Sequence, residues 1–388
     1  MNLSTLTIPA VRVFRRRLPL TLCILTLTVS SAPGQALEVV GKQLEIYGTL
    51  HPSLDYLDSD VSQTLADADP DDKLSAGDTS LSFNSSKLGV RGEISTDISG
   101  LSAVYQLEQN VNPDGKSNDT LNTRNSFAGL RTAQWTVLAG RHDSLFKSLA
   151  LRHSLLKHSV ADRGAILGAG AIHGNQMDIR AENMILGRYY LPLSDSRLEL
   201  QAQYSPDAVK SSGRVDNNKR EMFALAAEWK SAQRIFAFAW DHWANLSIGG
   251  TPGEVNAVRA LWKETAGQLT TAVIVESIDH TLNNGDAGEM DRNAIAVQAR
   301  YAVAGFRYLG QIMAADDYAD VSDSGAVMVS LGIEKPLSAS TRIYAMYTQT
   351  DNERNAAYQG VDGTHGDELA TQNGGTPKAF SIGSIINF

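Results

Sequence analysis

The sequence predicts an all-β fold, a transmembrane antiparallel β-barrel of 16 strands with one long loop folded inward. Runs of about ten β-prone residues recur along the chain, and breaks rich in Gly, Asp, Asn, Ser or Pro separate them. Several runs alternate apolar with polar side chains, which is the pattern of a half-buried strand. The breaks are alternately short and long, and this alternation is typical of barrels in an outer membrane.

The N-terminal segment, Met1 to Ala36, is predicted to be a secretory signal peptide. Four arginines between Arg12 and Arg17 precede an apolar run, Leu18 to Val29, which small residues follow. We expect cleavage after Ala36 and a single barrel domain over residues 37–388. Removing the segment takes four bases and no acids from totals of 34 and 43, so the mature chain has a net charge of −13. This charge argues against a nucleic-acid partner.

The only cysteine, Cys23, lies in the predicted signal peptide. A mature chain without thiols has no disulfide framework and no cysteine-bound metal. An alternative reading makes Cys23 a lipoprotein anchor, but the apolar run continues beyond it.

Sixteen strands follow from counting the β-prone runs. In Arg197 to Tyr204, for example, Leu198 and Tyr204 share one face and Glu199 lies on the other. The predicted strands are 44–57, 80–95, 101–112, 122–132, 136–144, 175–192, 197–205, 221–231, 234–246, 255–266, 268–280, 292–304, 306–318, 325–338, 341–351 and 378–388.

Two architectures compete for these strands, a soluble sandwich or propeller and a membrane barrel. A sandwich needs a strongly apolar face on each strand, whereas the apolar faces here are modest and charges occupy strand centres. Such charges suit a water-filled lumen, and barrels of 16 to 18 strands are wide enough for one. The charges are Lys87, Arg91, Glu93, Glu108, Arg124, Arg180, Glu276, Arg300 and Arg342. Aromatic residues near strand ends, including Tyr47 and Trp243, are expected to form interfacial girdles.

The longest interruption of the β pattern, Asp143 to Gly174, fits neither a strand nor a surface linker. Loops of this length inside a regular fold are usually functional. We expect this one to fold into the barrel and narrow it.

Several short motifs resemble the general Gram-negative porin family. They are Ser85-Ser-Lys-Leu-Gly-Val-Arg-Gly92, Ala103-Val-Tyr-Gln-Leu-Glu108, Thr123-Arg-Asn-Ser-Phe-Ala-Gly-Leu130, Ala139-Gly-Arg141 and the terminal Ile386-Asn-Phe388. The resemblance implies a homotrimer in the outer membrane, in contact with lipid and lipopolysaccharide. It also implies an inward-folded third extracellular loop, passive diffusion of small hydrophilic solutes and ions, and recognition of Phe388 by the assembly machinery.

The same resemblance assigns the pore residues. By motif position the basic wall includes Lys87 and Arg124, with Arg91, Arg141 and the acidic Glu108 nearby. The sequence departs from the family pattern in the inserted loop, where bases outnumber acids. The loop bases are Lys147, Arg152, Lys157 and Arg163, and its carboxylates are Asp162 and the flanking Asp143. We therefore expect a weak preference for anions.

Other functions find less support. Neighbouring residues such as His142 and Asp143 point to opposite faces of a strand, so they form no catalytic dyad, and the histidines show no metal spacing. The acidic run Asp67 to Asp72 lacks the ligand order of a calcium loop and is read as a solvated loop. We expect no enzyme activity and no cofactor. The alternatives that stay open are a substrate-specific channel, for example for an anionic solute class, and an outer-membrane hydrolase.

Overall fold

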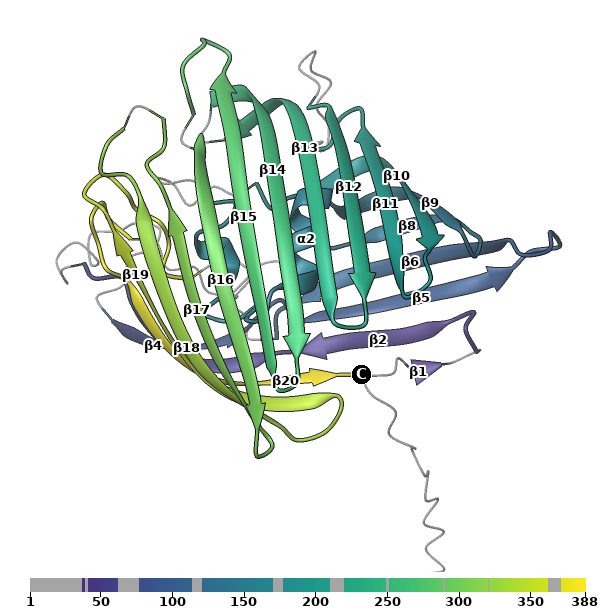
Figure 1. The fold of residues 1–388 in the computed structure, drawn as a ribbon, viewed down its shortest axis with the longest axis horizontal. Helices are drawn as coiled ribbons and strands as arrows, with labels where there is room; N and C mark the ends of the chain where they lie inside the picture. The colour runs from purple at the N-terminus through teal and green to yellow at the C-terminus, as the bar shows by residue number, and fades with distance from the viewer. Residues whose placement is uncertain are drawn as a thin grey trace, which may run out of the picture. The chain divides into compact units, whose positions relative to one another are not determined.

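A computed structural model of the chain describes residues 37–38, 41–61, 77–113, 121–169, 177–209, 220–248, 251–288, 290–319, 321–361 and 371–388. Within these ranges twenty strand segments form one antiparallel sheet (Figure 1). The first ten are β1 (Leu37–Glu38), β2 (Glu45–Leu50), β3 (Pro52–Asp58), β4 (Asp78–Phe83), β5 (Lys87–Ser95), β6 (Ser102–Val111), β7 (Leu121–Thr123), β8 (Ser126–Arg131), β9 (Trp135–Asp143) and β10 (Arg180–Pro192). The others are β11 (Ser196–Ser205), β12 (Met222–Ser231), β13 (Arg234–Ile248), β14 (Thr251–Ala266), β15 (Leu269–Leu282), β16 (Arg292–Val303), β17 (Phe306–Ala315), β18 (Ala326–Pro336), β19 (Thr341–Asn352) and β20 (Lys378–Asn387). A helix, α2 (Leu145–His153), and a 3-10 turn, η1 (Arg163–Ala165), lie between β9 and β10.

The twenty segments correspond to the sixteen predicted strands. Three strands are interrupted, so β2 and β3, β4 and β5, and β7 and β8 each make one strand, and the short β1 is an addition that pairs with β2. Ser85 has a left-handed backbone, with φ 45°, and the break between β4 and β5 lies there. The buried Asn84 side chain ties this break to β3 by donating to Ser53 Oγ at 2.8 Å. The predicted strand count is confirmed for the described residues.

The barrel closes where the last strand meets the first. Segment β20 pairs with β19 on one side and with β3 and β2 on the other, which Figure 1 shows beneath the longer strands. Thr49 Oγ1 donates to Asn387 Oδ1 at 2.9 Å, and the backbone N–H of Phe388 donates to the Gly48 carbonyl at 3.1 Å. A closed sheet has no free edge, so its backbone groups are paired at membrane depth.

The two faces of the wall have opposite character. In β11, Glu199 and Gln203 are 5% and 1% exposed, whereas Leu200 and Tyr204 are about two-fifths exposed. The same reversal runs through β20, where Ser381 is buried and Phe380 is exposed. Apolar side chains therefore cover the outside and polar ones the inside, which is the arrangement of a barrel in lipid around a polar interior.

One detail of the predicted aromatic girdles and one predicted strand boundary are wrong. Tyr47 and Trp243 do not belong to an outer girdle, because Tyr47 donates to the inward-facing Glu108 and Trp243 is fully buried. The strand expected from residue 175 begins at Arg180, since Met177 and Asp178 pack into the loop that precedes it. No helix in the described part of the chain is long and apolar enough to cross a membrane.

Candidate functional site: the charged lumen

The segment after β9 enters the barrel. Ser144 caps helix α2 by accepting a hydrogen bond from the Lys147 backbone N–H at 3.2 Å, and the helix then packs on β12, β13 and β14. Its partners on these strands include Asp241 and Glu228, which are buried residues of the polar face. The segment from Ser144 to Ala169 therefore lies against the inner wall, as Figure 1 shows for α2 behind β12 to β14.

An ion network fixes this segment to the wall. The Arg259 guanidinium of β14 is fully buried, contacts Asp178 at 3.0 Å and Glu276 at 2.6 Å, and donates to the Phe146 carbonyl at 2.9 Å. It also stacks 3.6 Å from the centre of the Phe146 ring. Burial alone would raise the pKa of the loop residue Asp178, but Arg259 and the other nearby cations hold it below its usual value. The carboxylate is thus ionised and shielded from water.

Two further arginines extend the network. Arg292 of β16 contacts Glu276 at 2.9 Å and donates to the loop carbonyls of Ile166 and Ala169 at 2.7 and 2.6 Å. Arg163 reaches Asp178 from the loop side and contacts Asp162 at 2.9 Å. Charged hydrogen bonds of this kind are among the strongest in proteins. We call Arg163, Asp178, Arg259, Glu276 and Arg292 the anchor network.

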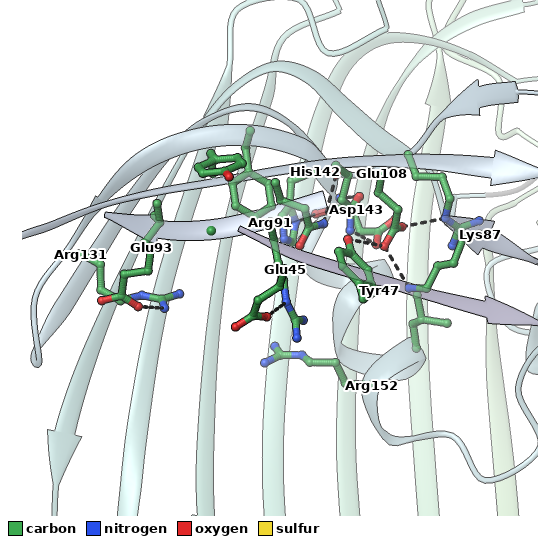
Figure 2. A pocket seen from close by; sticks show the side chains of 18 of the residues that line it. Glu45, Tyr47, Lys87, Arg91, Glu93, Glu108, Arg131, His142, Asp143 and Arg152 are labelled. Carbon is green, nitrogen blue, oxygen red and sulfur yellow. Dashed lines mark hydrogen bonds and ion pairs between the residues drawn. The ribbon is translucent and has the colours of Figure 1, made fainter. Parts of the chain in front are cut away.

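A cavity of about 700 Å³ lies between the loop and the wall formed by β2, β5, β6, β8, β9 and β10. Figure 2 shows its wall residues projecting into one space, with Arg152 approaching from the loop. Its centre is Glu108, whose carboxylate contacts Arg124 at 2.8 Å and Lys87 at 3.0 Å and accepts from the Tyr47 hydroxyl at 3.0 Å. Two cations thus share one buried acid.

The rest of this wall carries more exposed pairs. Arg91 contacts Glu45 at 2.8 Å and stacks 4.7 Å from the Tyr47 ring centre, and Arg131 contacts Glu93 at 3.4 Å. The side chain of Arg91 is 47% exposed. Water and ions in the cavity therefore reach these charges.

The loop bases have different environments. Arg152 lines the main cavity and lies 3.4 Å from Glu228 and 3.9 Å from Glu199. Lys157 also lines it, yet the described residues supply Lys157 with no ion pair. Burial, followed by the like charges of Arg342, Lys87 and Arg163, lowers the pKa of Lys157.

Four predicted pore residues line neither this cavity nor a smaller one beside it: Arg141, Lys147, Asp162 and Arg163. Lys147 is buried, donates to the Asp178 carbonyl at 2.6 Å and lies 3.5 Å from Asp143, and burial lowers its pKa. Asp162 and Arg163 are also buried, and the Asp162 carboxylate caps η1 through the Gly164 N–H at 3.0 Å.

Arg141 lies on the other face of β9 from the cavity-lining His142. Its guanidinium contacts Glu182 at 3.6 Å. Asp143 does line the cavity, but contacts to Lys147 and to Arg180, the latter at 3.1 Å, occupy its carboxylate.

A second cavity, of about 220 Å³, adjoins the first and shares Arg152 and Lys157 with it. Its wall adds four bases and one acid: Lys263, Arg300, Arg307, Arg342 and Glu334. Lys263 and Arg307 lie outside the motifs and the loop from which pore residues were predicted. The alternation of side chains along a strand could have placed both residues on the inner face. Lys263 shares the face of the buried Arg259 four residues earlier, and Arg307 shares that of the buried Gln311.

Two other kinds of site considered from the sequence are a metal site and a catalytic pair at Asp241 and His242. The described ranges hold no group of three His, Cys, Asp or Glu side chains that could bind a metal. The Asp241 carboxylate accepts from the Phe146 N–H at 3.0 Å inside the barrel, while the neighbouring His242 contacts Asn256. These two residues are therefore not a catalytic pair.

A closed barrel with an apolar exterior, a polar interior and a charged cavity beside an inserted loop defines a transmembrane channel. The family model described as Gram-negative porin matches residues 21–355. The chain belongs to the Gram-negative porin family, and it is an outer-membrane channel for diffusion. A comparison with curated proteins finds no match.

Solved structures with the same fold are distant in sequence. An anion-selective porin from Comamonas acidovorans is 18% identical, with a TM-score of 0.71, and the match covers 89% of this chain and 99% of that one. The outer-membrane protein OmpT of Vibrio cholerae is 16% identical, with a TM-score of 0.63, over 91% and 100% of the two chains. OmpF of Salmonella typhi, solved with daunomycin, is 15% identical, with a TM-score of 0.61 and the same coverage.

Proposed function

We propose that this channel passes small hydrophilic solutes and ions with a preference for anions, and that its selective region is the space between Lys157 and the wall around Glu108. The carrying observation is a charge imbalance. The main cavity is lined by eight basic and four acidic side chains, although the mature chain as a whole is predicted to be acidic. The exposed acids outside the barrel are screened beyond about 8 Å at physiological salt. The lumen charges therefore dominate the field that a passing ion meets.

Comparison of the two charge sets supports this preference. At about 4 Å a unit charge is worth roughly 4 kcal/mol at an effective dielectric of 20, against about 1 kcal/mol in bulk water. Lys157 has no acid within ion-pair distance in the described chain, and Lys87 and Arg124 share Glu108. The similar porin from Comamonas acidovorans is described as anion-selective.

Reconstitution in planar bilayers tests the proposal. We expect stepwise, open-channel conductance. In a KCl gradient at moderate salt, the sign of the zero-current potential should show that chloride is more permeant than potassium. Absence of conductance steps would contradict a channel. A zero-current potential of the sign expected for higher potassium permeability would contradict anion preference.

We further propose a homotrimer whose assembly depends on the C-terminal aromatic. One solved form of Vibrio cholerae OmpT is described as a trimer. The Phe388 ring lies over Gly48, where a methyl group would come within 2.5 Å of the ring, and it is 41% exposed on the outer face. Burial of such a ring contributes about 1.5–3 kcal/mol, which is small for a closed barrel. Replacing Phe388 by Ala should therefore lower the yield of assembled trimer far more than the heat resistance of trimers already formed.

The second candidate is a substrate-specific channel for an anionic solute class. The basic second cavity favours it, because a non-specific pore has no need of a second cluster of bases. Flux that saturates with one solute would support this function, and flux proportional to concentration for all solutes would favour simple diffusion. We expect no covalent chemistry in either case.

A further inference from the structure

The second cavity is built by two distant parts of the chain. The loop contributes residues 152, 154–157 and 159, and the wall contributes β14 and β16 to β20. The loop is held there by Gln298, which accepts from the Leu155 N–H at 2.9 Å, and by Gln311, which donates to the Ala161 carbonyl at 3.0 Å. Lys263 Nζ donates to the His153 carbonyl at 3.1 Å. The cavity is therefore a fixed feature of the docked loop.

Its charges do not balance. Six basic side chains and one acidic side chain line it. Glu334 is shared by Arg342 at 3.1 Å and Arg307 at 3.6 Å, and Arg152 is directed to acids beyond the cavity. Within the described residues no carboxylate lies in ion-pair distance of the remaining bases, which are Lys157, Lys263 and Arg300.

The free donors suit one class of ligand. The Arg300 guanidinium makes only a long contact, 3.4 Å to Thr270 Oγ1, so most of its donors are available. Guanidinium groups bind oxyanions with two parallel hydrogen bonds, and ammonium groups add point charges. Chloride offers no such geometry, and three unpaired cations disfavour any cation. Ser154 and Ser159 add hydroxyl groups to the lining.

We propose that this cavity is a binding site for a small multivalent oxyanion, held by Lys157, Lys263 and Arg300. The inference rests on the proposed function, because Lys157 and Arg152 belong to both cavities and give the anion access from the main one. An anion bound beside the conduction path lowers the chloride current for as long as it remains bound. The site thus makes the channel selective for a solute class as well as for a sign of charge.

The test is block of chloride conductance in planar bilayers at constant ionic strength, with phosphate, succinate and acetate as probes. We expect phosphate or succinate to reduce the current saturably, and monovalent acetate to have no saturable effect. Phosphate alone would assign the site to inorganic oxyanions, and succinate alone to dicarboxylates. Both outcomes support the site.

Matched variants locate the block. Arg300→Gln should raise the half-blocking concentration about tenfold or more, because a charged contact to the anion is lost. Lys157→Gln should act in the same direction, and it changes the loop without altering a strand. Arg234→Gln is the control, since Arg234 pairs with Glu264 at 2.8 Å on a neighbouring strand and lines neither cavity. Its half-blocking concentration should change less than about twofold.

Three results would overturn the inference. They are normal chloride conductance with no saturable block by either multivalent anion, saturable block by acetate equal to that by phosphate, and equal block in Arg300→Gln and the wild type. A chain that gives no chloride conductance contradicts the proposed channel itself, so the two failures are distinguishable.

Discussion

The two sides of this barrel use the same types of charged residue in opposite ways. Near β2 to β9, the Arg91 pair and the cluster around Glu108 face a cavity. Under the loop, Arg259 and Glu276 form an equally close pair with no solvent exposure. Arg91 and Lys87 of the first set are partly exposed and available to a solute, whereas the buried second set holds the loop in place. Position relative to the loop, and not residue type, decides which charges select and which support.

The largest effect on the supporting charges is expected from Arg259→Met. The substitution removes a cationic partner from the buried carboxylates of Asp178 and Glu276. Removing one partner of a buried ion pair destabilises a protein by about 3–5 kcal/mol. We expect the loop to detach, which should show as larger and noisier conductance and as new protease cleavage between residues 144 and 178.

Arg91→Met is the matched control for Arg259→Met. Its pair is half-exposed, and exposed pairs contribute only about 0–1 kcal/mol. Cleavage and conductance noise should stay at the wild-type level. Similar effects in both variants would show that burial of the anchor network does not matter.

Reversing the charge of the loop tests whether it acts on solutes. Changing Lys157 and Arg152 to Glu should reverse the sign of the zero-current potential in a KCl gradient. Lys157→Glu alone should supply most of this change, because Arg152 is already offset by Glu228 at 3.4 Å. An unchanged potential in both variants would mean that the loop charges do not reach the ion path.

Glu108→Gln tests the open wall. It frees Lys87 and Arg124 from their shared acid. If about 1 kcal/mol of the lost attraction survives screening, the chloride to potassium permeability ratio rises about fivefold. Reversal potentials measure it, and Glu199→Gln, next to Arg152, should give a change in the same direction. A fall in the ratio would contradict the placement of Glu108 at the ion path.

The pH dependence of selectivity should be the smallest effect. The lowered pKa of Lys157 means that this side chain loses its positive charge at a lower pH than an ordinary lysine. Chloride preference should therefore decline as pH rises toward the ordinary lysine range. Lys157→Arg, which stays charged, should remove this decline. The same decline in Lys157→Arg and the wild type would assign the titration to another group.

Much of the fold could be predicted from the sequence, because alternate residues of a strand lie on opposite faces and show directly which face is apolar. The alternation in β11 and β20 gave the outer and inner residues correctly, and the strand count followed. The site was less accessible. Motif position pointed to Lys87, Arg124 and Glu108, which line the main cavity, whereas Asp162 and Arg163 were expected in the lumen and line neither cavity. Which charges a docked loop covers depends on contacts such as Arg163 to Asp178, and local sequence does not record them.

The closing contact between Thr49 and Asn387 joins residues 338 positions apart. Folding of the wall cannot be completed until the last strand has been delivered, because only then do the first and last edges pair. Contacts of such long range form slowly, and unpaired strand edges promote aggregation. The pairing of the first and last strands stabilises the finished barrel, but until it forms the chain exposes unpaired edges and can aggregate. The topology of the barrel therefore requires that the chain be protected from aggregation on its way to the membrane.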